Sequence, residues 1–468
     1  MSKQSTKEEQ NGRQHVNWTP KDCPHSNPCS GVANKYTTKY KKKERLFVKA
    51  FPSTTFATTT LTFLRELAAT GEDLIPFQLD GEDAYLLLDP EVCLQALANT
   101  QHSSKNLPLM DASRITFGDG LFSSEEPLHL RQRRMMQPIF HTRRMDGLED
   151  TMQHSIDIML KDLEGVPTGT PIDIMKAMFS TTLRVIGEVV CSNDLTRQAN
   201  PISQFVDHAI RYLVGQLSEQ DLFLAQQRFE QAMEGVVQEH QQHPDTYHDL
   251  LSLLVAARDP ETGAAMPHKQ LSAELVTLVV AGHGTTALAL TWMCYEIARH
   301  PDCQGKVQEE LQTVLHERRP TLADLPNLPY IMGVFKEALR LYPPDTLIVR
   351  RVEREQMLSK QVVPAGSIIC VVPYVLQRDP RWWPEPDTFV PERWRNAAQP
   401  KAYLPWGSGA HVCIGRPLAE REAPLIFAAL MQRYPLSLPP EAPTIEPELR
   451  GFNIFPSATE IDTLLHPR

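Results

Sequence analysis

Apolar residues recur every three or four positions through most of the chain between residues 128 and 342, a spacing typical of amphipathic helices. Glycine, proline, asparagine or aspartate separates one such segment from the next. The pattern predicts helices over residues 61–69, 145–163, 172–191, 202–217, 222–242, 247–258 and 275–297. Short strands are predicted at residues 75–79 and 82–88, because the Asp80-Gly81 pair between them is a hairpin signal, and Asp89-Pro90 then opens another helix.

The pattern changes after Pro343. Eight prolines fall between residues 343 and 391, and the short apolar run 367–372 predicts a strand. One further helix is predicted over residues 416–434. Because the chain has no internal repeat and no linker-like stretch, residues 46–468 are predicted to form one large domain that is mainly α with small β-sheets.

The first 45 residues differ in composition from the rest. They hold ten lysines and arginines against four acids, in a chain whose net charge is −10. Such a polar tail could touch nucleic acid or anionic lipid. We favour a disordered solvated leader, since large apolar residues are few. Cys23, His25 and Cys29 resemble half of a metal knuckle, but no second half follows, so no metal site is expected there.

Neither an apolar signal segment nor a run of about 18 apolar residues is found. The eight cysteines are scattered, which favours reduced thiols over a disulfide framework. We therefore expect a cytoplasmic protein with no membrane span and no nucleic-acid partner.

One loop carries distinctive chemistry. Residues 405–415 place three glycines around Cys413, directly before the helix predicted at 416–434. Glycines allow close backbone approach, and the N–H groups of a loop and a helix start can stabilise a thiolate. A thiolate ligand of haem iron needs this environment. Taken alone, the loop is equally compatible with a buried cysteine in a glycine-rich turn.

This loop resembles the cysteine-ligand loop of the cytochrome P-450 family. The matching residues are Trp406, Gly407, Gly409, His411, Cys413 and Gly415. The resemblance implies the cytochrome P-450 fold, with haem b between an I-helix (residues 275–297) and an L-helix (residues 416–434). It also implies that Cys413 binds the iron and that Trp406, Gly407 and Gly415 lie against the cofactor.

A second match is Glu337 with Arg340, which resembles the family's K-helix, and Arg393 further along the chain. By resemblance the three form a buried structural lock that helps to retain the haem. Most Glu-x-x-Arg pairs are instead ordinary surface salt bridges.

A third match, residues 281–286, lies inside the predicted helix 275–297. Two glycines and two threonines are unfavourable in a helix interior, so a local break is expected, although a packing contact is the alternative. The resemblance makes this segment the dioxygen groove, with Thr285 ordering the proton-delivering water. The catalytic candidates are Thr285, Thr286 and Gly284.

A fourth match resembles the C-helix. By resemblance, His129 and Arg133 bind the haem propionates, together with Arg350 and His411. Cations pair naturally with those carboxylates. The alternative is a basic surface face.

Two positions depart from the family pattern. Gly284 stands where an acid usually precedes the threonine, which leaves water or the substrate to deliver protons. Trp406 replaces a phenylalanine, and its indole N–H either reaches the sulfur, which would raise the iron potential, or the ring merely packs.

The resemblance implies a monooxygenase that inserts one atom of O2 into a hydrophobic small molecule, such as a fatty acid, a terpenoid or another secondary metabolite. The candidate pocket walls are apolar for the most part: the loop 107–122, the helix near Val280 and Ala281, residues 345–349 and the C-terminal turn near Phe455. With no flavin or iron–sulfur segment, electrons are expected from a ferredoxin or flavodoxin with its NAD(P)H reductase. The alternatives are a peroxide-using or non-oxygenating haem-thiolate enzyme, favoured by Gly284, and a haem-binding sensor.

Overall fold

The computed structural model describes residues 48–51, 58–196, 201, 204–205, 208, 217–243, 245–395 and 399–467, and Phe47–Arg468 forms one compact unit. The predictions for the leader 1–45, including the group of Cys23, His25 and Cys29, lie outside the described residues. So does most of the predicted helix 202–217.

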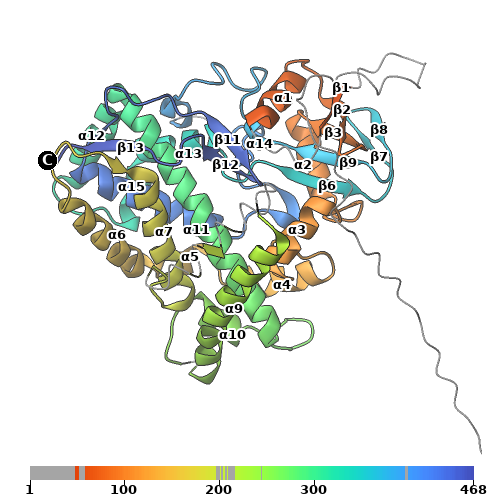
Figure 1. Cartoon of the computed structure of the whole chain (residues 1–468), viewed down its shortest axis with the longest axis horizontal. Helices are drawn as coiled ribbons and strands as arrows, with labels where there is room; N and C mark the ends of the chain where they lie inside the picture. The colour runs from red at the N-terminus through yellow and green to blue at the C-terminus, as the bar shows by residue number, and fades with distance from the viewer. Residues whose placement is uncertain are drawn as a thin grey trace, which may run out of the picture. The chain divides into compact units, whose positions relative to one another are not determined.

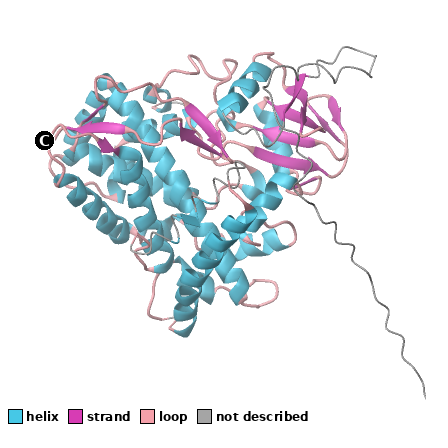
Figure 2. Cartoon of the chain, viewed as in Figure 1, coloured by secondary structure: helices cyan, strands magenta, loops and turns pink. Residues whose placement is uncertain are grey.

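Helices dominate the described chain, as predicted (Figure 2). Their bounds are α1 (Thr58–Ala68), α2 (Pro90–Ala98), α3 (Pro108–Phe117), α4 (Leu128–Met136), α5 (Thr142–Asp146), α6 (Glu149–Glu164), α7 (Ile174–Cys191), α9 (Glu219–Gln242), α10 (Leu250–Ala256), α11 (His268–Arg299), α12 (Pro301–Leu315), α13 (Pro329–Leu341), α14 (Pro373–Leu376) and α15 (Arg416–Arg433). Short 3-10 helices are η2 (Leu322–Asn327), η3 (Pro391–Trp394) and η4 (Gly409–His411).

The strands gather mainly in one six-stranded sheet at one side of the helices (Figure 1). Its order is β1 (Val48–Phe51), β2 (Leu74–Leu79), β3 (Glu82–Leu87), β9 (Ile368–Val371), β6 (Ile348–Val352) and β4 (Ser103–Ser104). Small sheets pair β10 (Leu436–Ser437) with β13 (Asp462–Leu465) and β5 (Ile172–Asp173), β11 (Pro447–Arg450) with β12 (Asn453–Pro456), and β7 (Gln356–Leu358) with β8 (Gln361–Val363).

The predicted hairpin is observed. Strands β2 and β3 pair antiparallel from Leu79 opposite Glu82 to Leu74 opposite Leu87. Asp80 and Gly81 between them have φ of 53° and 81°, the left-handed values that a tight two-residue hairpin turn requires. Asp89 caps the next helix, α2, by accepting a hydrogen bond from the backbone N–H of Val92.

Two segments differ from their predictions. The helix predicted over 145–163 is divided into α5 and α6 around Gly147 and Leu148. The backbone N–H of Gly147 donates to the carbonyl of Arg144, three residues earlier, which ends α5. The segment 107–122, predicted as a loop, contains α3, which starts after Leu107 with Pro108 in its first turn.

Helix α11 is the central element of the core and packs chiefly against α7, with further contacts to α13, α15 and α9. Among the described residues it is the one helix long and apolar enough to cross a membrane, but 72% of its most apolar window is buried inside the protein. A buried core helix has the same composition, so this feature is weak support for a membrane span.

The break expected in this helix is not observed. Residues 268–299 are α-helical throughout. Gly282 instead allows a close approach, because a Cβ there would lie 2.6 Å from Cδ1 of Ile186 on α7. The packing alternative therefore accounts for this glycine.

The predicted lock of Glu337, Arg340 and Arg393 is formed. Arg340 donates from Nε and Nη2 to the two oxygens of Glu337, at 2.9 Å and 2.7 Å, and Arg393 Nε donates to Oε1 at 3.2 Å. Glu337 and Arg340 are fully buried. The Trp394 indole N–H and the Val390 backbone N–H also donate to this carboxylate, so its Oε1 has three donors and its Oε2 has two.

Arg340 also joins α13 to the long irregular segment that leads to the cysteine loop. Its guanidinium donates to the backbone carbonyls of Gln377, Pro386 and Thr388. Gln377 in turn accepts the backbone N–H of Leu404, directly before the loop, at 2.8 Å. The lock therefore fixes where the cysteine loop begins.

Replacing Glu337 with glutamine leaves two arginines without their charge partner. Breaking a buried pair in this way costs about 3–5 kcal/mol, so Glu337→Gln is expected to lower the free energy of unfolding by that amount in urea denaturation. Glu91→Gln is the control, because its pair with Lys401 is exposed and such pairs contribute below about 1 kcal/mol. Equal effects of the two changes would contradict the lock.

Candidate functional site

The cysteine loop is shaped by its glycines. Gly407 and Gly409 have φ of 67° and 71°. A Cβ on Gly409 would lie 2.4 Å from the carbonyl oxygen of Leu97 on α2. The backbone N–H of Cys413 donates to the carbonyl of Trp406 at 2.9 Å, which closes the loop. The loop therefore needs glycine both for its backbone conformation and for its contact with α2.

Cys413 differs from the other described cysteines because its side chain is accessible, whereas four of them are buried and Cys303 is half-buried. Burial by the surrounding protein raises the pKa of the Cys413 thiol, and hydrogen bonds from the backbone N–H groups of Gly415 and Arg416 lower it. The charge of Arg133 also lowers this pKa, and that of Asp345 raises it. The sulfur is thus reachable, is surrounded by protein, and carries the N–H donors that the sequence predicted.

Gly415 lies directly beside the sulfur, since a Cβ on it would be 3.9 Å from Sγ of Cys413. Trp406 contacts Phe335 on α13, with ring centroids 6.4 Å apart. Among the described residues its indole N–H forms no hydrogen bond with the sulfur. The packing role is therefore the one that the geometry of Trp406 supports.

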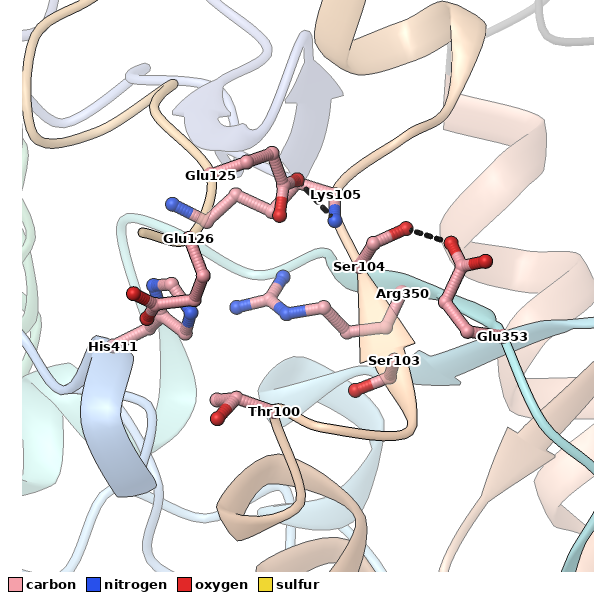
Figure 3. A pocket seen from close by; sticks show the side chains of 9 residues that line it. All are labelled: Thr100, Ser103, Ser104, Lys105, Glu125, Glu126, Arg350, Glu353 and His411. Atoms are coloured by element: carbon pink, nitrogen blue, oxygen red, sulfur yellow. Dashed lines mark hydrogen bonds between the residues drawn. The ribbon is translucent and has the colours of Figure 1, made fainter. Parts of the chain in front are cut away.

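The four side chains predicted to bind propionates are brought together. Arg133 on α4 donates to the carbonyl of Val412, next to Cys413, at 2.6 Å. The rings of His129 and His411 are in contact, with centroids 3.9 Å apart and planes tilted by 33°. Arg350 on β6 and His411 line one cavity of about 170 Å³ (Figure 3). The four come from three separate parts of the chain and meet on one side of the cysteine loop.

Electrostatics keep the two histidines neutral. Burial lowers the pKa of His411 to about 2, helped by the neighbouring charges of Lys105 and Arg350. Burial and Lys105 also lower the pKa of His129, against the opposing effect of its contact with Glu126. The Nδ1 atom of His411 is buried with no hydrogen-bond partner among the described residues.

Lys105 is a member of this cluster that the sequence reasoning missed. It is 5% exposed and its ammonium donates to the carbonyls of Phe122 and Ser124, at 2.8 Å and 3.2 Å. Burial lowers its pKa to about 7, and the nearby Arg350 adds to that effect. Lys105 lies in a short connection between β4 and α3 and belongs to no recognisable motif, so only its position in the fold reveals it.

This set of residues suits the two carboxylates of a haem. Buried cations are normally paired with anions, yet Lys105 and Arg350 form no ion pair within 4 Å among the described residues, although the charges of Glu125 and Asp345 act on Arg350. The unpartnered Nδ1 of His411 supplies a further polar atom that a carboxylate could satisfy. The charge of one of these cations, Arg133, acts on the sulfur of Cys413.

The catalytic candidates on α11 separate into two groups. The hydroxyl of Thr285 donates to the carbonyl of Ala281 at 2.7 Å and remains part-exposed. Nothing lies within 4 Å of a Cβ placed on Gly284, so it also borders open space. Thr286, by contrast, is buried. The accessible face of the helix therefore presents Thr285 and Gly284, and Thr286 is not brought to it.

Two of the predicted pocket walls meet. The ring of Phe122, after α3, contacts that of Phe452 in the turn between β11 and β12, with centroids 6.2 Å apart. Buried Glu274 on α11 holds the segment before Phe122, because its carboxylate accepts the backbone N–H of Leu121 at 2.9 Å. The segment 107–122 is thereby tied to the central helix.

Comparison with known proteins identifies the family. The family model described as Cytochrome P450 matches residues 51–460. The chain belongs to the cytochrome P450 family, whose members bind haem, and it is an oxidoreductase of the monooxygenase class. The predicted family, fold class and enzyme class are therefore confirmed.

Particular relatives are similar over most of their length. Cyclooctatin synthase of Streptomyces melanosporofaciens is 34% identical, over 80% of this chain and 85% of that protein. Cyclooctat-9-en-7-ol 5-monooxygenase of the same organism is 31% identical, over 80% and 85% of the two chains. Pentalenene oxygenase of Streptomyces avermitilis is 28% identical, over 87% and 91%. The crystal structure of the cytochrome P450DA heme domain, 23% identical, shares the fold with a TM-score of 0.79 over 87% of this chain and 93% of that one.

Gly409→Ala is expected to displace the cysteine loop, because the methyl group meets the Leu97 carbonyl and the backbone has a positive φ. After expression with a haem supply, the ratio of Soret to protein absorbance should fall severalfold. Gly305→Ala on α12 is the control, since no atom lies within 4 Å of its new methyl group. An unchanged ratio in Gly409→Ala would show that the loop does not require this glycine.

Proposed function

We propose that the chain is a haem-thiolate monooxygenase, that residues 46–468 form its haem domain, and that Cys413 is the iron ligand. The observation that carries this proposal is the accessible sulfur with the N–H groups of Gly415 and Arg416 directed at it. Such donors stabilise an ionised sulfur and moderate its electron donation to a metal.

His129, Arg133, Arg350 and His411, with the addition of Lys105, would hold the two propionates. Arg133 and Arg350 can each pair with a carboxylate, while the neutral imidazole of His411 can offer an N–H. Trp406, Gly407 and Gly415 would lie against the cofactor on the side of the sulfur. The haem, when bound, supplies the activation of dioxygen, and the thiolate promotes cleavage of the O–O bond.

The residues of α11, across the proposed site from Cys413, would deliver protons. Thr285 is the residue we assign to it, because its hydroxyl is accessible and is held by the Ala281 carbonyl. The hydroxyl oxygen can still accept a hydrogen bond from a water molecule and so fix that water in place. Gly284 offers no acid, so protons reach this water through other waters or through the substrate. Thr286, being buried, supports the helix and does not touch the reactants.

The substrate we propose is a terpenoid, from among the hydrophobic classes that the sequence left open. The names of two relatives denote oxidation of an unsaturated hydrocarbon, pentalenene, and of an unsaturated alcohol, cyclooctat-9-en-7-ol. The walls that meet at Phe122 and Phe452 are apolar and suit such a molecule.

Electrons are proposed to come from a ferredoxin or flavodoxin with its NAD(P)H reductase, and the protein is proposed to work in the cytoplasm. A peroxide-driven reaction is the second candidate, and the specific observation that favours it is the missing acid at Gly284. Thr285 favours the dioxygen reaction, because that reaction consumes two protons from outside, which a water held by this hydroxyl can deliver, whereas hydrogen peroxide brings its two protons with it.

The carbon monoxide difference spectrum of the reduced protein tests the ligand. The wild type is expected to give the Soret band characteristic of thiolate-ligated haem. Cys413→Ala should lose that band, whereas Cys303→Ala, a change of another cysteine that is at least partly exposed, should keep it. Retention of the band in Cys413→Ala would overturn the assignment.

Thr285→Ala should uncouple the reaction. Without the hydroxyl, the water that delivers protons is no longer held in place. The amount of peroxide released per NAD(P)H consumed should therefore rise about tenfold or more, because positioned proton transfer typically contributes about 10²–10⁴-fold to a reaction rate. Thr286→Ala is the matched control and should leave the ratio near that of the wild type. Product formed only with added peroxide, and never with the reductase system, would decide for the second candidate.

A further inference from the structure

Asp345 is an acid among the apolar walls of the pocket. It lies in the extended segment between α13 and β6, where it forms an isolated bridge with Asn453. Its neighbour Thr346 is fully buried and accepts the backbone N–H of Tyr374. Because successive side chains of an extended segment point to opposite sides, Asp345 points away from that core.

The charge of Asp345 acts on both Cys413 and Arg350, so the carboxylate faces the space that these two residues border. Yet it forms no ion pair within 4 Å among the described residues: the Nη1 of Arg350 donates instead to its own neighbour, the carbonyl of Val349, at 2.7 Å. Asp345 therefore does not serve as a structural counter-ion.

The carboxyl of Asp345 also accepts no hydrogen bond from any residue that the structure describes. Its Oδ1 is buried with no partner among the described residues, although the residue as a whole is part-exposed. Burial raises the pKa of Asp345 to about 7. An unsatisfied buried carboxyl costs folding free energy, and it is retained where a ligand can satisfy it.

We infer that Asp345 is a specificity-determining residue that accepts a hydrogen bond from a hydroxyl group of the substrate. The inference rests on the proposed function and narrows it: the substrate is an oxygenated terpenoid alcohol and not a bare hydrocarbon. An analogue without the hydroxyl leaves the Asp345 carboxyl unpaired in the complex, which weakens its binding. The site thereby distinguishes an alcohol from the corresponding hydrocarbon, which apolar contacts alone cannot do. The hydroxyl also fixes which C–H bond is presented for attack.

Azole ligands test this without knowledge of the natural substrate. 4-Phenylimidazole binds haem iron through nitrogen and shifts the Soret band, and its three hydroxyphenyl isomers place a hydroxyl group at different points around the ring. At least one isomer is expected to bind the wild type about tenfold more tightly than the parent compound, the gain typical of a hydrogen bond to a charged group.

Asp345→Leu and Asp345→Ala should abolish that preference, bind the parent compound at least as tightly as the wild type, and raise the free energy of unfolding. A structural role for Asp345 predicts a lower free energy of unfolding instead. Glu355→Gln is the matched control, because Glu355 is an exposed acid between β6 and β7 and does not line the cavity of Arg350 and His411, and it should keep the preference.

The inference is overturned if no isomer is preferred by the wild type, or if the preference survives in both Asp345 variants. Failure of the proposed function looks different. If haem-loaded wild type shows no spectral shift with any of the imidazoles, the haem site itself is wrong, and the inference falls with it.

Discussion

The proposed iron ligand, Cys413, must hold an ionised sulfur inside the protein, and the rest of this structure depends on that constraint. Burial alone raises the pKa of the Cys413 thiol. The backbone N–H groups of Gly415 and Arg416, at the start of α15, oppose that effect, and the cation of Arg133 adds to them. Backbone donors act only if the loop keeps its shape. Its positive φ angles, its contact with α2 and its attachment to α13 through the Glu337 lock all serve that requirement.

The opposite side of the site follows from the packing of α11. Gly282 lets this helix approach α7 closely, and the helix stays regular, so Ala281, Gly284 and Thr285 share one accessible face. Glu274 on the same helix ties down the segment that ends at Phe122. One rigid helix thereby positions the proposed proton relay and part of the pocket wall, while the acid that would complete the relay is absent.

Features whose residues lie at short, fixed spacings along the chain could be predicted from the sequence. Residues that are close in sequence are also close in the structure, so the residue types and their spacing together indicate the role. The loop around Cys413, the pair of Glu337 and Arg340, and the hairpin at Asp80-Gly81 are of this kind. Lys105 and the role of Asp345 could not be predicted, since each depends on contacts between segments far apart in the chain. The helix break expected within residues 281–286 was wrong, because a glycine needed for a close contact, as Gly282 is with Ile186, and a glycine at a backbone break give the same sequence signal. Gly147 divided α5 from α6 for a local reason that apolar spacing does not record.

Iron K-edge X-ray absorption of the ferric, haem-loaded protein tests whether Cys413 is the iron ligand, because it reports the atoms bound to the iron. One sulfur scatterer is expected in the first coordination shell of the wild type, absent in Cys413→Ala and present in Cys303→Ala. A first shell of nitrogen and oxygen alone in the wild type, or a sulfur that persists in Cys413→Ala, would contradict it.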